Sequence, residues 1–170
     1  MLINYRDKSP VLGARCFVAE NAAVIGDVKL GDDCSVWFGA SVRGDFVSIT
    51  VGDRTNIQDN VTIHTNENGP TVIGSDVSIG HNAVVHSAVL EDGVLVGMGS
   101  VVLDRAVIGA GSIVGAGAVV TKGTVVPPNS LVMGVPARVV RTLAPGSNLE
   151  NARNYLERKD QYLADLAGRD

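Results

Sequence analysis

Aliphatic residues recur at every sixth position along most of this chain. The first run of the repeat consists of Val18, Val24, Leu30, Val36 and Val42. After two short breaks the pattern resumes and continues to Val132, and glycine often follows the aliphatic residue. A period of six fits neither an amphipathic helix, which repeats at 3.6 residues, nor a simple strand, which repeats at two. It is typical of a parallel β-helix, in which each hexapeptide forms a short strand and a corner and three hexapeptides form one coil.

The interruptions and the end of the repeat predict the remaining elements. Insertions at residues 44–50 and 65–71 are expected to form loops along one edge of the solenoid. Residues 144–147 form a predicted hinge before a helix over about residues 148–167, whose apolar residues recur at helical spacing and should pack along the solenoid. Ser147 or Asn148 can cap this helix. We therefore predict an all-β fold with a β-helix domain over residues 1–143 and a hinge and C-terminal helix over residues 144–170, together forming a single domain.

Composition and charge narrow the class of protein. The 170 residues are enough for one domain, and with 45% hydrophobic but only 4% aromatic residues the core must consist of Val, Ile, Leu and Ala. A net charge of −4 without a basic run makes nucleic acid and anionic membranes unexpected partners. The sequence has no apolar signal core and no bilayer-spanning stretch, so a cytoplasmic location is expected. Cys16 and Cys34 lie one coil apart and should stack as buried, free thiols.

The three histidines of the chain, His64, His81 and His86, fall on defined positions of the repeat. Counting three repeats per coil places Arg43, His64 and His86 in one vertical column, so His64 and His86 should be about 4.8 Å apart at the backbone. His81 falls in another column, above Asp59. It precedes His86 by five residues of extended chain, which can span up to about 16 Å.

This arrangement predicts a metal site shared between chains. His64 and His86 can reach one ion, but one chain would struggle to add His81 at metal–nitrogen distances of about 2.0–2.1 Å. A neighbouring chain that presents its own His81 solves this problem, and a three-sided prism is suited to a three-fold homotrimer with three equivalent sites. The alternative interpretation is that the histidines are surface or hydrogen-bonding residues.

Several motifs of the chain together resemble a known family. They are Arg43-Gly44-Asp45, Asn56-Ile57-Gln58-Asp59, His64, Ile79-Gly80-His81-Asn82-Ala83, His86, Gly97-Met98-Gly99 and Met133-Gly134-Val135-Pro136-Ala137. In combination they are similar to the gamma-class carbonic anhydrases, and the closer match is to short bacterial gamma-carbonic anhydrase-like proteins. The resemblance covers nearly the whole chain. As in other hexapeptide-repeat proteins, it implies a left-handed β-helix.

The resemblance also implies an activity. It implies Zn²⁺, or Fe²⁺ or Co²⁺ as in some members, held by His64, His81 and His86, with an open position for a water whose pKa falls to about 7. The metal-bound hydroxide would then convert carbon dioxide reversibly to bicarbonate at the trimer interface. In the family, the residues matching Gln58 and Asn56 orient the hydroxide and the substrate.

The resemblance assigns further residues, and departures from the family weaken some assignments. Residues matching Arg43, Asp45 and Asp59 form charged contacts at the subunit interface of the family; a purely structural ion-pair network is the alternative. Phe46 stands where the best-known members carry a glutamate, and the loop after His64 is short. Glu67 has the spacing of a proton-shuttling glutamate, although a solvated loop acid is the alternative.

Tyr155 and the overall function also have competing interpretations. Tyr155 resembles a family tyrosine near the active site, but it could equally serve core packing, which is also our interpretation of Trp37 and Phe38.

A second possible function of the protein is that of a hexapeptide acyltransferase or thioesterase acting on acyl-CoA; those transferases commonly use one histidine as a base. A third is a metal-binding trimer with little or no turnover, which the shortened acidic loop keeps open.

Overall fold

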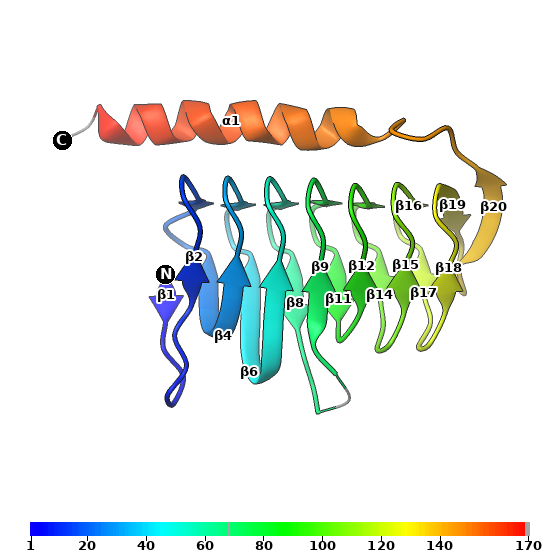
Figure 1. The fold of residues 1–170 in the computed structure, drawn as a ribbon, viewed down its shortest axis with the longest axis horizontal. Helices are drawn as coiled ribbons and strands as arrows, with labels where there is room; N and C mark the ends of the chain where they lie inside the picture. The colour runs from blue at the N-terminus through cyan, green and yellow to red at the C-terminus, as the bar shows by residue number, and fades with distance from the viewer. Residues whose placement is uncertain (68, 169–170) are drawn as a thin grey trace.

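The computed structural model describes residues 1–67 and 69–168 and consists of a parallel β-solenoid with one helix along its side (Figure 1). Most strands have only two or three residues, because each hexapeptide must also supply a corner. The elements are β1 (Leu2–Ile3), β2 (Val11–Leu12), β3 (Phe17–Val18), β4 (Ala23–Leu30), β5 (Ser35–Val36), β6 (Ser41–Val51), β7 (Asn56–Ile57), β8 (Thr62–His64), β9 (Thr71–Ile73), β10 (Ser78–Ile79), β11 (Val84–His86), β12 (Val89–Leu90), β13 (Leu95–Val96), β14 (Val101–Val102), β15 (Val107–Ile108), β16 (Ile113–Val114), β17 (Val119–Val120), β18 (Val125–Val126), β19 (Ser130–Met133), β20 (Arg138–Thr142) and α1 (Leu149–Ala167).

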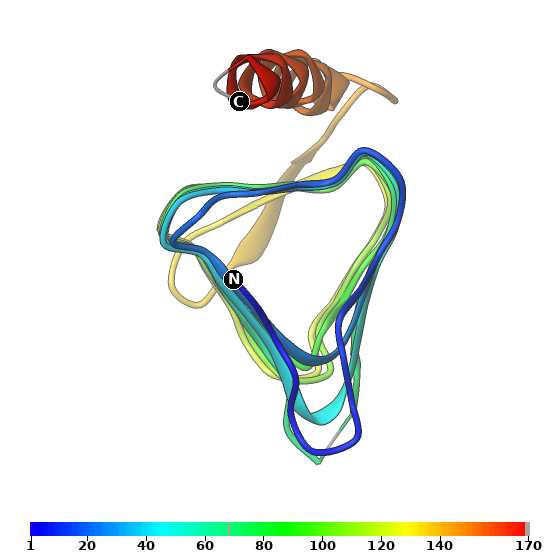
Figure 2. The ribbon, with the colours of Figure 1, turned by 90° about the vertical axis from the view of Figure 1, so that its left-hand side faces the viewer.

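The strands form three flat faces. The first face stacks β8, β11, β14 and β17, and the second stacks β9, β12, β15 and β18; the long strand β6 joins these two faces into one 12-stranded sheet. The third face is an eight-stranded sheet of β3, β5, β7, β10, β13, β16 and β19, with β20 antiparallel at its end. Viewed along the axis, the coils superimpose as a triangle (Figure 2). The predicted left-handed β-helix with a C-terminal helix is therefore confirmed.

The inward position of each hexapeptide builds the core. Val42, Ile63, Val85 and Val102 lie in register on successive coils, and each is completely buried. β-Branched side chains suit this position because they pack against the same residue type on the coils above and below. The stacked columns hold the backbone register that positions polar side chains on the outside of the prism.

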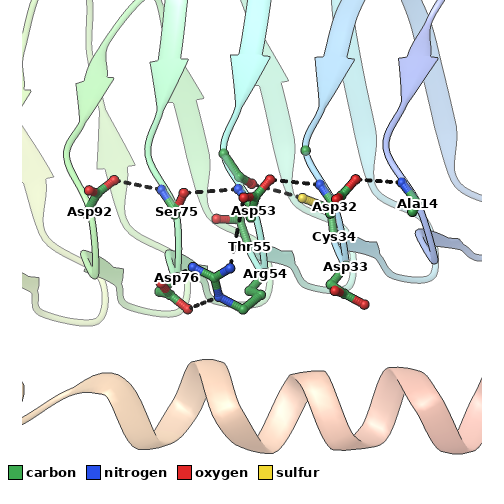
Figure 3. Close-up of polar contacts among 12 residues, drawn as sticks. Ala14, Asp32, Asp33, Cys34, Asp53, Arg54, Thr55, Ser75, Asp76 and Asp92 are labelled. Carbon is green, nitrogen blue, oxygen red and sulfur yellow. Dashed lines mark hydrogen bonds and ion pairs between the residues drawn. The ribbon is translucent and has the colours of Figure 1, made fainter.

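A ladder of side-chain-to-backbone hydrogen bonds runs along the corner between the second and third faces (Figure 3). Asp92 Oδ1 accepts from Ser75 N at 2.8 Å, Ser75 Oγ accepts from Asp53 N at 3.1 Å, and Asp53 Oδ1 accepts from Asp32 N at 2.9 Å. Asp32 Oδ1 continues the series to Ala14 N at 2.7 Å. These bonds satisfy corner amides that no strand can pair.

Helix α1 lies over the third face and runs back from the last coil toward the first (Figures 1 and 2). Ala152 of the helix is buried against the solenoid, and Tyr155 and Leu163 pack against the core, as predicted. Leu166 was expected to pack but is 47% exposed, because it lies in the last turn of the helix near the end of the solenoid. Among the described residues, no helix is both long and apolar enough to cross a lipid bilayer.

The start of α1 differs from the prediction. Asn148 occupies the N-cap position, but its side chain makes no capping hydrogen bond to the helix. Its amide group instead donates to Gly93 O on the solenoid at 2.7 Å. Asn148 therefore anchors the helix to the solenoid rather than completing the first turn.

A buried lysine fixes the other half of the helix. Lys159 is completely buried, and its Nζ atom lies 2.9 Å from Asp33 Oδ1, 3.2 Å from Arg15 O and 2.7 Å from Asp160 Oδ1. Asp33 also pairs with Arg15. The charge of the lysine is thus compensated where the helix meets the first two coils, as a buried ammonium group requires.

Two expectations about local structure are corrected. Residues 44–50 belong to strand β6 rather than to a separate loop, but the pairing with β4 is interrupted between Gly44, which pairs with Gly26, and Ile49, which pairs with Val28. The second insertion does leave the sheet after His64, in a turn whose residue 68 lies outside the described residues. Cys34 is buried as expected, but Cys16 is only partly buried because β3 is the first strand of its sheet; both thiols are free.

Candidate metal centre

His64 and His86 end strands β8 and β11 and are direct partners across the sheet. Their facing ring nitrogens, His64 Nδ1 and His86 Nε2, are 3.1 Å apart, and the ring centroids are 5.1 Å apart. Arg43 is the partner of His64 on the preceding coil. The predicted column of Arg43, His64 and His86 is therefore present, and we call this region the paired-histidine corner.

Each of these two histidines also touches an aspartate. His64 Nε2 lies 2.9 Å from Asp45 Oδ1, and His86 Nδ1 lies 2.6 Å from Asp104 Oδ1. Burial opposes ionisation of Asp45, but hydrogen bonds from His64 and Arg43 outweigh it and lower the pKa of this carboxyl. Hydrogen bonds from Asn66 and His86 lower the pKa of Asp104. Both carboxyl groups are therefore anionic at neutral pH.

The donor arrangement of the paired-histidine corner fits a metal ion. A neutral imidazole has one N–H group and one lone pair, and the anionic partners Asp45 and Asp104 favour the tautomers whose N–H groups face them. In these tautomers the lone pairs of His64 Nδ1 and His86 Nε2 face each other at 3.1 Å, an arrangement that a cation between them would stabilise. Two nitrogen ligands of a tetrahedral zinc ion are about 3.3 Å apart when metal–nitrogen distances are about 2.0–2.1 Å.

His81 lies at a different corner, where the third face turns into the first. It follows β10, and its Nδ1 atom is 2.8 Å from Asp59 Oδ2 on the preceding coil. Its Nε2 atom lies 3.2 Å from the hydroxyl of Tyr155 on α1. Burial and the negative charge of Asp59 raise the pKa of Tyr155, so the phenol stays protonated at neutral pH. We call this region the helix-covered corner.

Gln58 and Asn56 lie beside His81 under the helix. Both side chains are buried, and Gln58 Nε2 donates to Asn56 Oδ1 at 2.9 Å, while Asn56 Nδ2 donates to Ser78 Oγ at 2.8 Å. Gln58, His81 and Tyr155 line one cavity of about 340 Å³ between α1 and the third face. The structure thus groups Asn56, Gln58, Asp59, His81 and Tyr155 at the helix-covered corner.

Other predicted residues have separate surroundings. Arg43 and Asp45 join the paired-histidine corner through their mutual ion pair. Glu67 is exposed in the turn after His64 and, within residues 1–67 and 69–168, forms no hydrogen bond or ion pair with a histidine. Trp37 packs against Phe17, Tyr155 and Tyr162 with ring centroids 5.0–5.4 Å apart, in agreement with a packing role.

One chain therefore holds its three histidines in two separate groups. The part of the chain that the structure describes contains no cluster of three or more His, Cys, Asp or Glu side chains able to hold a metal ion. The paired-histidine corner could supply two nitrogen donors, and the helix-covered corner could supply one. A site with all three histidines as ligands would need the corners of two different chains to meet.

Sequence reasoning missed Asp104 and its partner Asn66. Asp104 Oδ2 accepts a hydrogen bond from Asn66 Nδ2 at 2.8 Å, in addition to the contact of Oδ1 with His86. A signal was available: Leu103 occupies the column of His64 and His86 on the next coil, and Asp104 follows it directly. A side chain one position beyond the column can turn back toward the histidine below.

Comparisons with known proteins agree with the fold described above. The model of the family described as bacterial transferase hexapeptide (six repeats) matches residues 87–122. A carbonic anhydrase of Geobacillus kaustophilus is 46% identical over 167 residues, covering 96% of this chain and 92% of the relative. The mitochondrial gamma carbonic anhydrase 2 of Arabidopsis thaliana is 42% identical over 164 residues, covering 91% of this chain and 59% of the relative.

A solved structure extends the comparison. A hexapeptide transferase family protein from Anaplasma phagocytophilum has a TM-score of 0.90 at 40% identity, covering 95% of this chain and 98% of that one. The repeat and the solenoid thus define a hexapeptide-repeat β-helix protein. The Geobacillus relative matches over nearly both whole lengths, and the Arabidopsis relative is named a gamma carbonic anhydrase: the chain belongs to the gamma-class carbonic anhydrase family.

Proposed function

We propose that the protein is a carbonic anhydrase that interconverts carbon dioxide and bicarbonate at a metal ion shared between neighbouring chains of a homotrimer. One observation carries the proposal: each of the three histidines has one ring nitrogen against an aspartate and its other nitrogen directed away from it. Carboxylate–histidine pairs of this kind orient the ligands of metal sites and fix their tautomers. Three such pairs in one small domain support a metal-binding role for these histidines over the alternative that they are ordinary surface residues.

The ligand set follows from these orientations. His64 Nδ1 and His86 Nε2 of one chain and His81 Nε2 of the next would hold the ion, with zinc as the first candidate and iron or cobalt compatible with the same imidazoles. When bound, the ion supplies the Lewis acidity that lowers the pKa of a coordinated water to about 7. The open fourth position of such a three-histidine set is what hydration chemistry needs.

Other residues of the chain have roles that their surroundings support. Gln58 donates its amide hydrogens to Asn56 and Asn151, which leaves its carbonyl oxygen to orient a water or the substrate. The Tyr155 hydroxyl lies 3.2 Å from His81 Nε2, the nitrogen that would face the ion. Phe46 is 60% exposed and its ring lies 5.8 Å from that of His64, so it would provide an apolar wall suited to carbon dioxide.

The test combines metal content with turnover. Purified protein should contain about one metal ion per chain, and stopped-flow hydration of carbon dioxide should proceed well above the buffer rate after loading with zinc or ferrous iron. Chelation should abolish the rate, and metal addition should restore it, with the circular dichroism spectrum unchanged because the core does not depend on the ion. Full metal occupancy without any rate above buffer would refute the proposed activity and leave a metal-binding trimer.

Sharing of the site between chains has its own test. His64→Ala and His81→Ala chains, each lacking one ligand, should bind little metal alone. When the two variants are unfolded together and assembled into mixed trimers, some interfaces collect three intact ligands, and part of the metal should return. If mixed trimers bind no more metal than either variant alone, the ligands are not shared in this way.

A transferase function is the second candidate because the Anaplasma relative is named a hexapeptide transferase. In that case the cavity beside His81 would hold part of an acyl-CoA, with His81 as the base. Tight binding of acetyl-CoA by metal-free protein would favour this function, whereas binding of metal without acetyl-CoA would favour the carbonic anhydrase.

A further inference from the structure

We infer that Asp104, held in place by Asn66, is a positioning residue for His86 in the proposed metal site. The inference rests on the proposed function, because it assigns His86 as a ligand. It adds a residue that lies outside the motifs on which the resemblance to the family rests, and that contacts His86 rather than the proposed ion.

The contacts form a continuous chain from the second insertion to the histidine ring. Asn66 Nδ2 donates to Asp104 Oδ2 at 2.8 Å, and Asp104 Oδ1 lies 2.6 Å from His86 Nδ1. The Asp104 side chain is 16% exposed and the His86 side chain is 27% exposed, so little water competes for these bonds. Both carboxylate oxygens are thus occupied, one by the loop and one by the ring.

The backbone fixes where this carboxylate can lie. Arg105 N donates to Ser87 O at 2.7 Å, which ties the residues directly after Asp104 and His86 to each other. Ser87 Oγ in turn accepts a hydrogen bond from Asn66 N at 2.9 Å. Asp104 is therefore held on the coil above His86 by the main chain, and Asn66 selects the direction of its side chain.

We call the hydrogen-bonded pair of Asn66 and Asp104 the clamp. It fixes the orientation and tautomer of the His86 ring, which strand β11 does not fix. Strand β11 places the backbone of His86, but its ring can still rotate and exchange tautomers. A carboxylate against Nδ1 retains the proton on that nitrogen and directs the lone pair of Nε2 toward His64 Nδ1, 3.1 Å away. Without the clamp, the two ligand nitrogens would face each other only part of the time.

The experiment measures zinc affinity by competition with a chelator in the full-length protein. We expect Asp104→Asn to weaken zinc binding about 10–100-fold, the usual effect of losing such a partner. The substitution keeps an acceptor for His86 but turns an NH₂ group toward the NH₂ group of Asn66. The swapped double variant Asn66→Asp/Asp104→Asn restores the match of donor and acceptor at constant charge, and it should recover most of the lost affinity.

A matched control and a metal-free measurement complete the test. Asp92→Asn alters a corner aspartate that contacts Ser75 N and no histidine (Figure 3), and its zinc affinity should stay within twofold of wild type. In metal-free protein, ¹⁵N imidazole shifts should report protonated Nδ1 for His86 in the wild type and mixed tautomers in Asp104→Asn. Unchanged zinc affinity and unchanged His86 shifts in Asp104→Asn, or a swap that recovers nothing, would overturn the inference.

The outcomes separate the two proposals. A wild type that binds zinc through the clamp yet hydrates no carbon dioxide would refute the activity and support the positioning role. An active wild type whose affinity and His86 tautomer are insensitive to Asp104 would support the activity and refute the positioning role.

Discussion

The attachment of helix α1 to the first coils depends on one buried ion pair, and its removal should be measurable. We consider Asp33→Asn, which leaves the shape of the side chain but removes the charge facing Lys159. Lys159 is completely buried and its Nζ atom lies 2.9 Å from Asp33 Oδ1. The variant should therefore destabilise the docked helix while the solenoid core stays intact.

The magnitude follows from the surroundings of the pair. Hydrogen bonds from Arg15 and then Lys159 lower the pKa of Asp33 from 3.8 to about 2, which corresponds to at most about 2.4 kcal/mol. Solvent screening reduces this figure because the Arg15 side chain is 65% exposed. Removing one partner of a buried pair costs about 3–5 kcal/mol, but Asp160 remains 2.7 Å from Lys159. We expect a loss of about 2 kcal/mol in the free energy of unfolding.

The assay is urea unfolding at fixed protein concentration, since assembly would make stability concentration-dependent. Trp37 is the only tryptophan and packs against Tyr155 and Tyr162 of α1, so its fluorescence reports helix docking directly. Asp76→Asn, which breaks an exposed pair with Arg54, is the control and should cost less than about 1 kcal/mol. A loss below about 0.5 kcal/mol with unchanged Trp37 emission would show that the pair does not hold the helix.

The same features lead to further expectations. Because the pKa of Asp33 is lowered, its contribution to stability is complete above about pH 4 and is lost as the pH falls toward 2; the difference in unfolding free energy between wild type and Asp33→Asn should shrink over that range. Ile63→Ala should cost about 2–5 kcal/mol in urea unfolding because Ile63 is completely buried in the core column, whereas exposed Thr62→Ala should cost no more than about 0.5 kcal/mol. Tyr155→Phe should shift the NMR signals of His81 by removing the hydroxyl 3.2 Å away, with His86 unaffected as an internal control.

The period of the repeat was sufficient to predict most of the fold and the stacking of the histidines. Counting coils placed Arg43 under His64 and His64 under His86, and the strand register confirms both. This worked because a solenoid has one register that buries every aliphatic column. The same count placed Asp59 under His81, which the contact between them confirms.

Features that depend on side-chain reach or on irregular backbone could not be predicted in this way. Asp104 lies one position beyond the histidine column, and only its side-chain direction brings it to His86. Lys159 lies on the same helix face as Ala152 and Leu163, but a lysine is rarely fully buried, and only the position of Asp33 on the solenoid explains its burial. The extension of β6 through the first insertion depends on β4 continuing around the same corner, which the hexapeptide count does not reveal.

Because α1 runs back along the solenoid, the paired-histidine corner and the helix-covered corner form at different times during synthesis. Contacts between coils join residues close in sequence, such as His64 and His86, 22 positions apart. The contacts of the helix join residues much farther apart in sequence, with a separation of 74 positions between His81 and Tyr155 and of 126 positions between Asp33 and Lys159. Coils can therefore add one after another as the chain emerges, and the paired-histidine corner forms early. The helix-covered corner is finished only after α1 has been synthesised, so the proposed shared sites would form later than the coils that carry their histidines.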